Sequence, residues 1–202
     1  MTVIKICGIT RLVDAQSAVD SGADMLGFVF APSKRWIDGD SAKEIIDAVR
    51  GHPLTVGVFV NAGVNEMNHL ARVCGLDLIQ LSGDEPDDIV AALDRPAIKA
   101  IHVCGDEPPE LLQERIETAG AELVLLDTAR AGTYGGTGET FNWERLPAIR
   151  RRIMLAGGLH AGNVAEAIRV VEPWGVDVSS GVERKGVKDS DKIGAFIRAA
   201  RS

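Results

Sequence analysis

The chain has 202 residues and a formal net charge of −7, and it is 46% hydrophobic and 25% charged, as expected of one globular domain. The negative charge and the lack of a Lys/Arg block disfavour a nucleic-acid-binding surface. No apolar run reaches the roughly 18–20 residues of a membrane span, and the N-terminus lacks a signal-peptide layout. Three cysteines without paired spacing predict neither a disulfide framework nor a zinc site. We expect a single cytoplasmic domain over residues 1–202.

Apolar runs and amphipathic patterns alternate along the whole chain. Strands are predicted at residues 3–9, 25–30, 54–60, 76–81, 97–103, 121–127, 152–156 and 176–179. Helices are predicted at residues 14–21, from about 41 with Ser41 as N-cap, and at 64–74, 87–93, 109–118, 142–149, 163–171 and 190–200. Eight βα units with short connections predict an α/β fold, a single-domain (β/α)₈ TIM barrel. An open doubly wound sheet is the alternative, but no G-x-G-x-x-G follows the first strand.

Two turns of small residues follow the last two predicted strands. One contains Gly157 and Gly158, and the other contains Ser180 and Gly181. Glycine and serine let backbone N–H groups approach a phosphate closely, and (β/α)₈ barrels often bind phosphate after strands seven and eight. These turns predict a phosphorylated small-molecule ligand, held by local donors because the chain as a whole is anionic.

Two chemically active side chains end predicted strands on opposite sides of the ring. Cys7 closes the first strand beside Gly8, which suggests an accessible thiol, although a small buried filler is an equal alternative. Asp127 closes the sixth strand after four apolar residues, where an N-cap or loop-ordering role is the alternative. At the mouth of a closed barrel, the pair is suitably placed to act as base and acid on a small substrate.

The alternation of a strand places Lys5 on the same face as Cys7. A buried ammonium needs a partner, and Asp177 on the strand that closes the barrel is the candidate. We predict that a Lys5–Asp177 pair braces the floor of the site and that the charge of Lys5 favours the Cys7 thiolate. The alternative is that Lys5 extends to solvent from a frayed strand end.

Other polar residues are predicted near the barrel mouth. Arg35, beside Lys34, is either ordinary surface charge or a bidentate clamp for a carboxylate. Gln80 and Ser82 share a strand face, and we expect both to contact a polar ligand. The four histidines lack metal-ligand spacing, so each is predicted to be structural or solvated.

Several motifs occur together in an ordered series. They are Lys5-Ile6-Cys7-Gly8-Ile9-Thr10, Gly27-Phe28-Val29-Phe30 with Ser33-Lys34-Arg35, Val56-Gly57-Val58-Phe59-Val60-Asn61, Leu126-Asp127, Gly135-Gly136-Thr137-Gly138 with Phe141-Asn142-Trp143, Leu155-Ala156-Gly157-Gly158-Leu159, and Asp177-Val178-Ser179-Ser180-Gly181-Val182-Glu183. From residue 3 to about 197, the sequence resembles the phosphoribosylanthranilate isomerase family of tryptophan biosynthesis.

The resemblance implies an Amadori rearrangement of N-(5′-phosphoribosyl)anthranilate to 1-(o-carboxyphenylamino)-1-deoxyribulose 5-phosphate, without a cofactor or metal. It implies Cys7 as general base and Asp127 as general acid, with the pKa of the thiol lowered and that of the carboxyl raised. It also implies that the phosphate meets Gly157, Gly158, Ser180 and Gly181, and that Arg35 meets the anthranilate carboxylate. Residues 131–138 are expected to close over the substrate.

One residue departs from the family pattern, because Ser82 stands where a histidine is common. Two other functions stay open. One is the related aminoaldose isomerase of histidine biosynthesis, or a dual-substrate barrel, although that relative normally carries Asp at the position of Cys7. The other is a phosphosugar-binding subunit without activity. We expect a monomer or homodimer that binds neither nucleic acid nor membrane.

Overall fold

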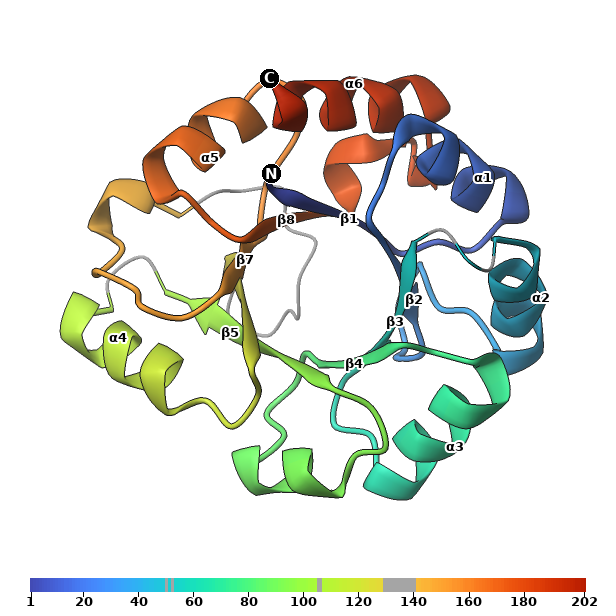
Figure 1. Cartoon of the computed structure of the whole chain (residues 1–202), viewed down its shortest axis with the longest axis horizontal. Coiled ribbons are helices and arrows are strands. Elements are labelled where there is room, and N and C mark those ends of the chain that lie inside the picture. Colours follow the sequence, from blue (N-terminus) through green and yellow to red (C-terminus); the bar gives the residue numbers. More distant parts are fainter. Residues whose placement is uncertain (50, 52, 105–106, 129–140) are drawn as a thin grey trace.

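The structure, a computed structural model, describes residues 1–49, 51, 53–104, 107–128 and 141–202. Eight parallel strands close into a barrel in sequence order (Figure 1). They are β1 (Val3–Cys7), β2 (Met25–Val29), β3 (Leu54–Phe59), β4 (Leu78–Leu81), β5 (Ala97–Val103), β6 (Leu123–Thr128), β7 (Ile153–Leu155) and β8 (Gly175–Val178). The predicted TIM barrel is confirmed, and the open-sheet alternative is wrong because β1 pairs with both β2 and β8.

Helices surround the barrel on its outside (Figure 1). They are α1 (Leu12–Ser21), α2 (Gly39–Val49), α3 (Val64–Cys74), α4 (Pro109–Thr118), α5 (Val164–Val171) and α6 (Ser190–Arg201), with 3₁₀ turns η1 (Asp87–Ala92), η2 (Trp143–Arg145) and η3 (Ser180–Val182). In the described part of the chain, no helix is long and apolar enough to cross a membrane.

Side chains of each strand alternate between two apolar layers. On β6, Val124 and Leu126 join the large core between barrel and helices, whereas Leu123 and Leu125 join a smaller core inside the barrel. Because the alternation continues, Asp127 at the end of β6 also points inward. The same alternation separates Lys5 and Cys7 from the outward residues of β1. The inner core therefore ends in polar groups at the mouth.

Three predicted helix features are wrong in detail. The helix expected at residues 142–149 is only the turn η2, because Pro147 holds the preceding Leu146 extended, with φ −63° and ψ 137°. The helix expected at residues 87–93 is η1, since only six residues separate Pro86 from the extended Leu93. The start of α2 is capped by Asp38 and not by Ser41, whose backbone N–H donates to the Asp38 carboxylate at 2.9 Å.

A hairpin after η3 has no counterpart among the predicted elements. Strands β9 (Glu183–Arg184) and β10 (Val187–Lys188) pair antiparallel, with Glu183 opposite Lys188. Lys185 and Gly186 both have positive φ, at 53° and 82°, as a two-residue turn of primed type requires. The hairpin returns a buried acidic and a buried basic side chain to the rim of the barrel.

Candidate active site

A cavity of about 590 Å³ opens at the carboxyl ends of the strands. Its lining includes Cys7 at the end of β1, Gln80 on β4, Asp127 on β6, Asp177 on β8 and Arg35 in the loop after β2. The structure therefore brings the predicted thiol, carboxyl, amide and guanidinium into one space. This is the end of a (β/α)₈ barrel at which active sites form.

The floor of the cavity contains a buried ion pair. Lys5 and Asp177 are partners in the β1–β8 register, and Lys5 Nζ lies 3.0 Å from Asp177 Oδ1. Lys5 is fully buried, so the predicted pair is confirmed and an extended, solvent-exposed Lys5 is wrong. Burial lowers the pKa of Lys5, but Asp177 and the Cys7 thiol outweigh it, so the pKa is raised and the ammonium persists.

Cys7 differs from its prediction in two ways. The residue is only 7% exposed, so it is a buried thiol that faces the cavity and not an accessible one. Burial raises the pKa of Cys7, and Lys5 lowers it only part of the way back, so the pKa is raised and not lowered as expected. Gly27, its register partner on β2, makes room for the thiol, because a Cβ there would lie 2.9 Å from Cys7 Sγ.

Asp127 has the environment expected of an acid. Its pKa is raised to about 6, mainly by burial; His102 opposes the shift and Asp177 adds to it. His102 is the register partner of Asp127 on β5 and lines the same cavity, although spacing alone predicts a structural or solvated histidine. Its Nε2 lies 3.1 Å from the Ser82 carbonyl oxygen, and because a carbonyl only accepts, Nε2 carries a hydrogen.

Gln80 on β4 and Ser82, directly after its end, face the same side, as predicted. The Gln80 amide nitrogen donates to Ser82 Oγ at 2.9 Å, and both residues line the cavity. Gln80 Oε1 is buried without a hydrogen-bond partner among the described residues. It is therefore an acceptor available to a hydroxyl or amine of a bound ligand.

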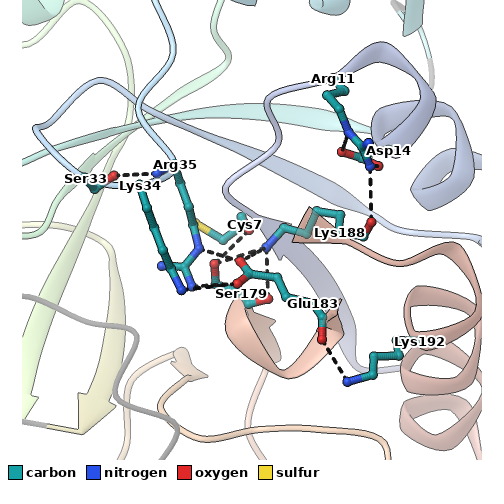
Figure 2. A network of polar contacts seen from close by, with 10 residues as sticks. All are labelled: Cys7, Arg11, Asp14, Ser33, Lys34, Arg35, Ser179, Glu183, Lys188 and Lys192. Carbon is teal, nitrogen blue, oxygen red and sulfur yellow. Dashed lines mark hydrogen bonds and ion pairs between the residues drawn. The ribbon is translucent and has the colours of Figure 1, made fainter. Parts of the chain in front are cut away.

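Arg35 already holds a carboxylate of this chain. Its Nε donates to Glu183 Oε1 at 2.6 Å and its Nη2 to Glu183 Oε2 at 3.2 Å (Figure 2). Lys188 Nζ lies 3.0 Å from Glu183 Oε1 and donates to the Ser179 carbonyl oxygen at 2.9 Å. Ser179 Oγ in turn donates to the Cys7 carbonyl oxygen at 3.0 Å. A polar network thus joins the rim arginine to the segment that carries the thiol.

The sequence prediction missed the role of Glu183 and did not single out Lys188. Both are buried charges that the β9–β10 hairpin brings to the barrel, so their positions depend on an element that was not predicted. The adjacent Lys185-Gly186 pair was the available signal, because such pairs favour a two-residue hairpin turn.

The two glycine turns pack against each other at the ends of β7 and β8. Gly157 and Gly158 have φ of 81° and 64°, which only glycine adopts readily. A Cβ on Gly181 would lie 1.9 Å from the Leu159 carbonyl oxygen, so the close approach of the turns requires glycine. Among the described residues that line the cavity, none comes from these turns. The predicted closing loop, residues 131–138, lies outside the described residues.

Comparison with known proteins bears on this arrangement. Residues 4–199 match the family described as N-(5′-phosphoribosyl)anthranilate (PRA) isomerase. The chain belongs to this family. It is 48% identical over 200 residues to the N-(5′-phosphoribosyl)anthranilate isomerase of Pseudomonas putida strain GB-1, covering 98% of this chain and 96% of that protein. The corresponding isomerase of Roseiflexus castenholzii is 47% identical over 209 residues, covering 99% and 98%.

Solved structures of phosphoribosylanthranilate isomerases share the fold. The Thermotoga maritima enzyme is similar with a TM-score of 0.87 at 39% identity, over 100% of this chain and 99% of that one. A second structure, with a TM-score of 0.84 at 38% identity and the same coverage, is a complex with reduced 1-(o-carboxyphenylamino)-1-deoxyribulose 5-phosphate.

In the described part of the present chain, no cluster of three or more His, Cys, Asp or Glu could hold a metal ion.

Proposed function

We propose that the chain catalyses the Amadori rearrangement of N-(5′-phosphoribosyl)anthranilate, with Asp127 as general acid and Cys7 as general base. Its family makes it an isomerase of tryptophan biosynthesis, and the proposal concerns which residues carry the reaction. One observation supports it above the others. A carboxyl with a pKa of about 6 and a thiol line the same cavity, so a proton donor and a potential proton acceptor face one substrate.

Asp127 acts in the first step. Its protonated carboxyl donates to the furanose ring oxygen, the bond from C1′ to that oxygen breaks, and the anthranilate nitrogen supplies the electron pair that forms an iminium. The raised pKa supports this role because it leaves a substantial protonated fraction near pH 6. A carboxyl with the ordinary pKa of about 3.9 would be almost fully ionised at that pH.

Cys7 acts in the second step. Its thiolate removes the proton from C2′, and the electron pair of that C–H bond moves to form an enolamine, which tautomerises to the ketone. Because the pKa of Cys7 is raised, only a minority of molecules hold a thiolate together with a protonated Asp127. The iminium formed in the first step is a positive charge in the same cavity, and it favours the thiolate when the base is needed.

The ends of the substrate are assigned to the remaining residues. We assign the phosphate to the backbone N–H groups of Gly157, Gly158, Ser180 and Gly181, which share the barrel mouth with the cavity. We assign the anthranilate carboxylate to Arg35 and a hydroxyl of the sugar to the buried acceptor Oε1 of Gln80.

Assembly and location are further parts of the proposal. We infer a monomer or homodimer in the cytoplasm that does not bind nucleic acid. A relative from Thermotoga maritima is described as dimeric, and the net charge of −7 disfavours a polyanionic partner. Light scattering during size exclusion, with and without added DNA, tests the assembly and the partner together.

A turnover assay tests the residue roles. The purified chain is incubated with phosphoribosylanthranilate, and loss of anthranilate fluorescence is followed for wild type, Cys7→Ala and Asp127→Asn. Each variant should lose about 10²- to 10⁴-fold in kcat, the contribution of a positioned acid or base. Cys74→Ala is the matched control, because Cys74 is a buried thiol of α3 in the outer core and should leave kcat nearly unchanged. Unimpaired turnover in either site variant would contradict the assigned role.

The pH dependence gives a second readout. With the carboxyl pKa at about 6 and the thiol pKa raised, kcat/KM should rise to about pH 6, stay level, and fall above the thiol pKa. In Asp127→Asn the levelling near pH 6 should vanish, and the residual rate should keep rising with the thiolate fraction. Turnover of the histidine-pathway aminoaldose by the same preparation would favour the dual-substrate alternative, and ligand binding without any turnover would favour the non-catalytic one.

A further inference from the structure

Arg35 leaves one edge of its guanidinium open. The edge formed by Nε and Nη2 is engaged by the two oxygens of Glu183, and among the described residues no hydrogen bond or ion pair engages Nη1. A guanidinium presents its donors along two edges, each of which fits a carboxylate in bidentate fashion. With the side edge occupied, the end edge formed by Nη1 and Nη2 remains for a ligand in the cavity that Arg35 lines.

Glu183 is itself held in place from several directions. It is 8% exposed, and its carboxylate contacts Lys188 at 3.0 Å as well as Arg35, with the exposed Lys34 at 3.5 Å. Its backbone carbonyl accepts from Lys192 Nζ at 2.8 Å. Figure 2 shows Arg35, Lys34 and Lys188 around the Glu183 carboxylate, with Lys192 at the backbone carbonyl. The β9–β10 hairpin and the contact from α6 therefore fix the backbone of Glu183, and the surrounding cations hold its carboxylate.

The stem of Arg35 is fixed as well. A Cβ on Gly8, whose φ is 81°, would lie within 3.3 Å of Arg35 Cγ, which shows how closely the arginine stem crosses the β1 loop. The Arg35 backbone N–H donates to Ser33 Oγ at 3.1 Å. The contacts of this chain therefore fix both the stem and the guanidinium of Arg35.

The charges of this cluster do not balance. Glu183 is a single anion between the Arg35 guanidinium and the buried Lys188 ammonium, and Lys34 adds a third cation at the rim. Arg35 and Lys188 hold the pKa of Glu183 at about 2 against the opposing effect of burial, so this carboxylate stays ionised at every pH at which the protein works. The cluster keeps a net positive charge, which suits a second carboxylate.

We propose that Glu183 is a positioning residue that presents the open edge of Arg35 to the aromatic carboxylate, and that it thereby makes the site selective for a carboxylate-bearing aminosugar phosphate. This inference rests on the proposed function. An arginine held in advance loses less side-chain freedom when its ligand binds. The competing interpretation is that Glu183 sequesters Arg35 and must release it, and it predicts the opposite change in affinity.

The experiment compares two ligands that differ only in the carboxylate. One is reduced 1-(o-carboxyphenylamino)-1-deoxyribulose 5-phosphate, and the other is the same compound built on aniline in place of anthranilate. Binding of each to wild type and Glu183→Gln is measured by calorimetry, which needs no turnover. Glu183→Gln should weaken the carboxylate-bearing ligand about 3- to 10-fold and change the other ligand by less than twofold, as expected for the loss of one preordered side chain.

A double-mutant cycle tests whether Glu183 acts through Arg35. In Arg35→Met, the further change Glu183→Gln should alter the ratio of the two affinities by less than twofold, since no guanidinium remains to be positioned. Because Gln at position 183 leaves the Lys188 ammonium without its carboxylate, Glu183→Gln/Lys188→Gln is measured in parallel and should show the same loss of discrimination. The double variant keeps the test available where the single one does not fold.

The outcomes separate this inference from the function on which it rests. Equal weakening of both ligands in Glu183→Gln would overturn the positioning role and leave a structural one, and tighter binding of the carboxylate ligand would favour sequestration. Either result leaves the isomerase proposal intact. Wild-type binding of neither ligand would overturn the substrate assignment and the present inference together, whereas the selective loss supports both.

Discussion

Burial shifts the pKa in the same direction on the two sides of the cavity, but the shift has opposite consequences for catalysis. Around β1 and β8, Cys7 lies beside the Lys5–Asp177 pair, and around β5 and β6, Asp127 lies beside His102. Burial is the largest influence on both titrating groups and raises both pKa values. A raised pKa keeps more of the Asp127 carboxyl protonated near neutral pH, so it is available as a proton donor. The same shift lowers the fraction of Cys7 that is thiolate and available as a base.

The difference indicates when each group becomes competent. The acid is tuned by the fold alone, because a neutral carboxyl is the form that burial favours. The fold favours the thiolate of the base only in part, because Lys5 lowers the pKa of Cys7 against the effect of burial but is also paired with Asp177. The remaining shift must come from charge that appears in the cavity during the reaction. We therefore expect substitutions on the Cys7 side to lower stability and shift the thiol pKa. Substitutions on the Asp127 side are expected to lower activity while raising stability.

The largest effect is expected for Lys5→Met. The substitution preserves most of the side-chain volume but leaves the Asp177 carboxylate buried without its counter-ion, which should lower the free energy of unfolding by about 3–5 kcal/mol. It should also raise the pKa of Cys7 further, because Lys5 is the charge that favours the thiolate most. Denaturant unfolding and a thiol titration measure the two effects separately.

The control for Lys5→Met is Lys43→Met, which removes an exposed pair with Asp47 on α2. Such a pair contributes about 0–1 kcal/mol, so little change is expected. Lys5→Met/Asp177→Asn removes both charges and should recover part of the lost stability. An unchanged Cys7 titration in Lys5→Met would show that the lysine braces the floor without tuning the thiol.

A smaller effect of opposite sign is expected for Asp127→Asn. In the native protein the pKa of Asp127 is about 6, above the ordinary 3.8, so the native state binds more protons between these values and stability falls as pH rises through them. Above about pH 6 the ionised carboxyl destabilises wild type by up to about 3 kcal/mol, because its pKa is raised from 3.8 to about 6. The amide cannot ionise and escapes this penalty.

Asp127→Asn should therefore be more stable than wild type at pH 7–8, with the difference shrinking towards pH 4. Thermal unfolding across this range measures it, and Asp20→Asn, an exposed carboxyl on α1, is the control without such a trend. A gain that is independent of pH would mean that the variant acts by packing and not by ionisation. Combined with the loss of kcat, the expected result would identify Asp127 as a group kept for chemistry at the expense of folding.

The contrast between the two sides also explains which features were predictable from the sequence. Alternation along β1 predicted that Lys5 shares the face of Cys7, and the place of Asp127 after four apolar residues predicted that it lies at the barrel mouth, because both patterns are local. The Lys5–Asp177 pair followed from closure of the barrel. The direction of the Asp127 shift was also predicted. The direction of the Cys7 shift was not, since it depends on how completely Gly27 and the barrel wall exclude water from the thiol.

Features that depend on tertiary packing were harder to predict. Arg35 was expected to hold a carboxylate of the substrate, but its bidentate partner Glu183 lies 148 residues away and reaches it only through the β9–β10 hairpin. His102 was assigned a structural or solvated role from spacing, although its register with Asp127 places it at the cavity. In both cases the relevant neighbour lies on another strand or hairpin, where no pattern within one segment could indicate it.

The smallest effect is expected for Gly27→Ala, because Gly27 packs directly against the Cys7 thiol. A Cβ on Gly27 would lie 2.9 Å from Cys7 Sγ and 3.1 Å from both Lys5 Nζ and the Cys7 Cα, so Gly27→Ala must displace the thiol from its place beside Lys5. Because a reacting group misplaced by a fraction of an ångström loses alignment with its target, kcat should fall by about tenfold, or ~1.4 kcal/mol in the barrier.

Gly63→Ala is the matched control for this last substitution, because Gly63 has φ −71° and no atom within 4 Å of an added Cβ. Turnover and thiol titration of the folded variants decide the question. Retained kcat in Gly27→Ala would mean that the reaction tolerates a displaced thiol. A loss of kcat with Cys7 titrating at still higher pH would show that the position of the thiol relative to Lys5, and not its burial alone, determines how much thiolate is available to the reaction.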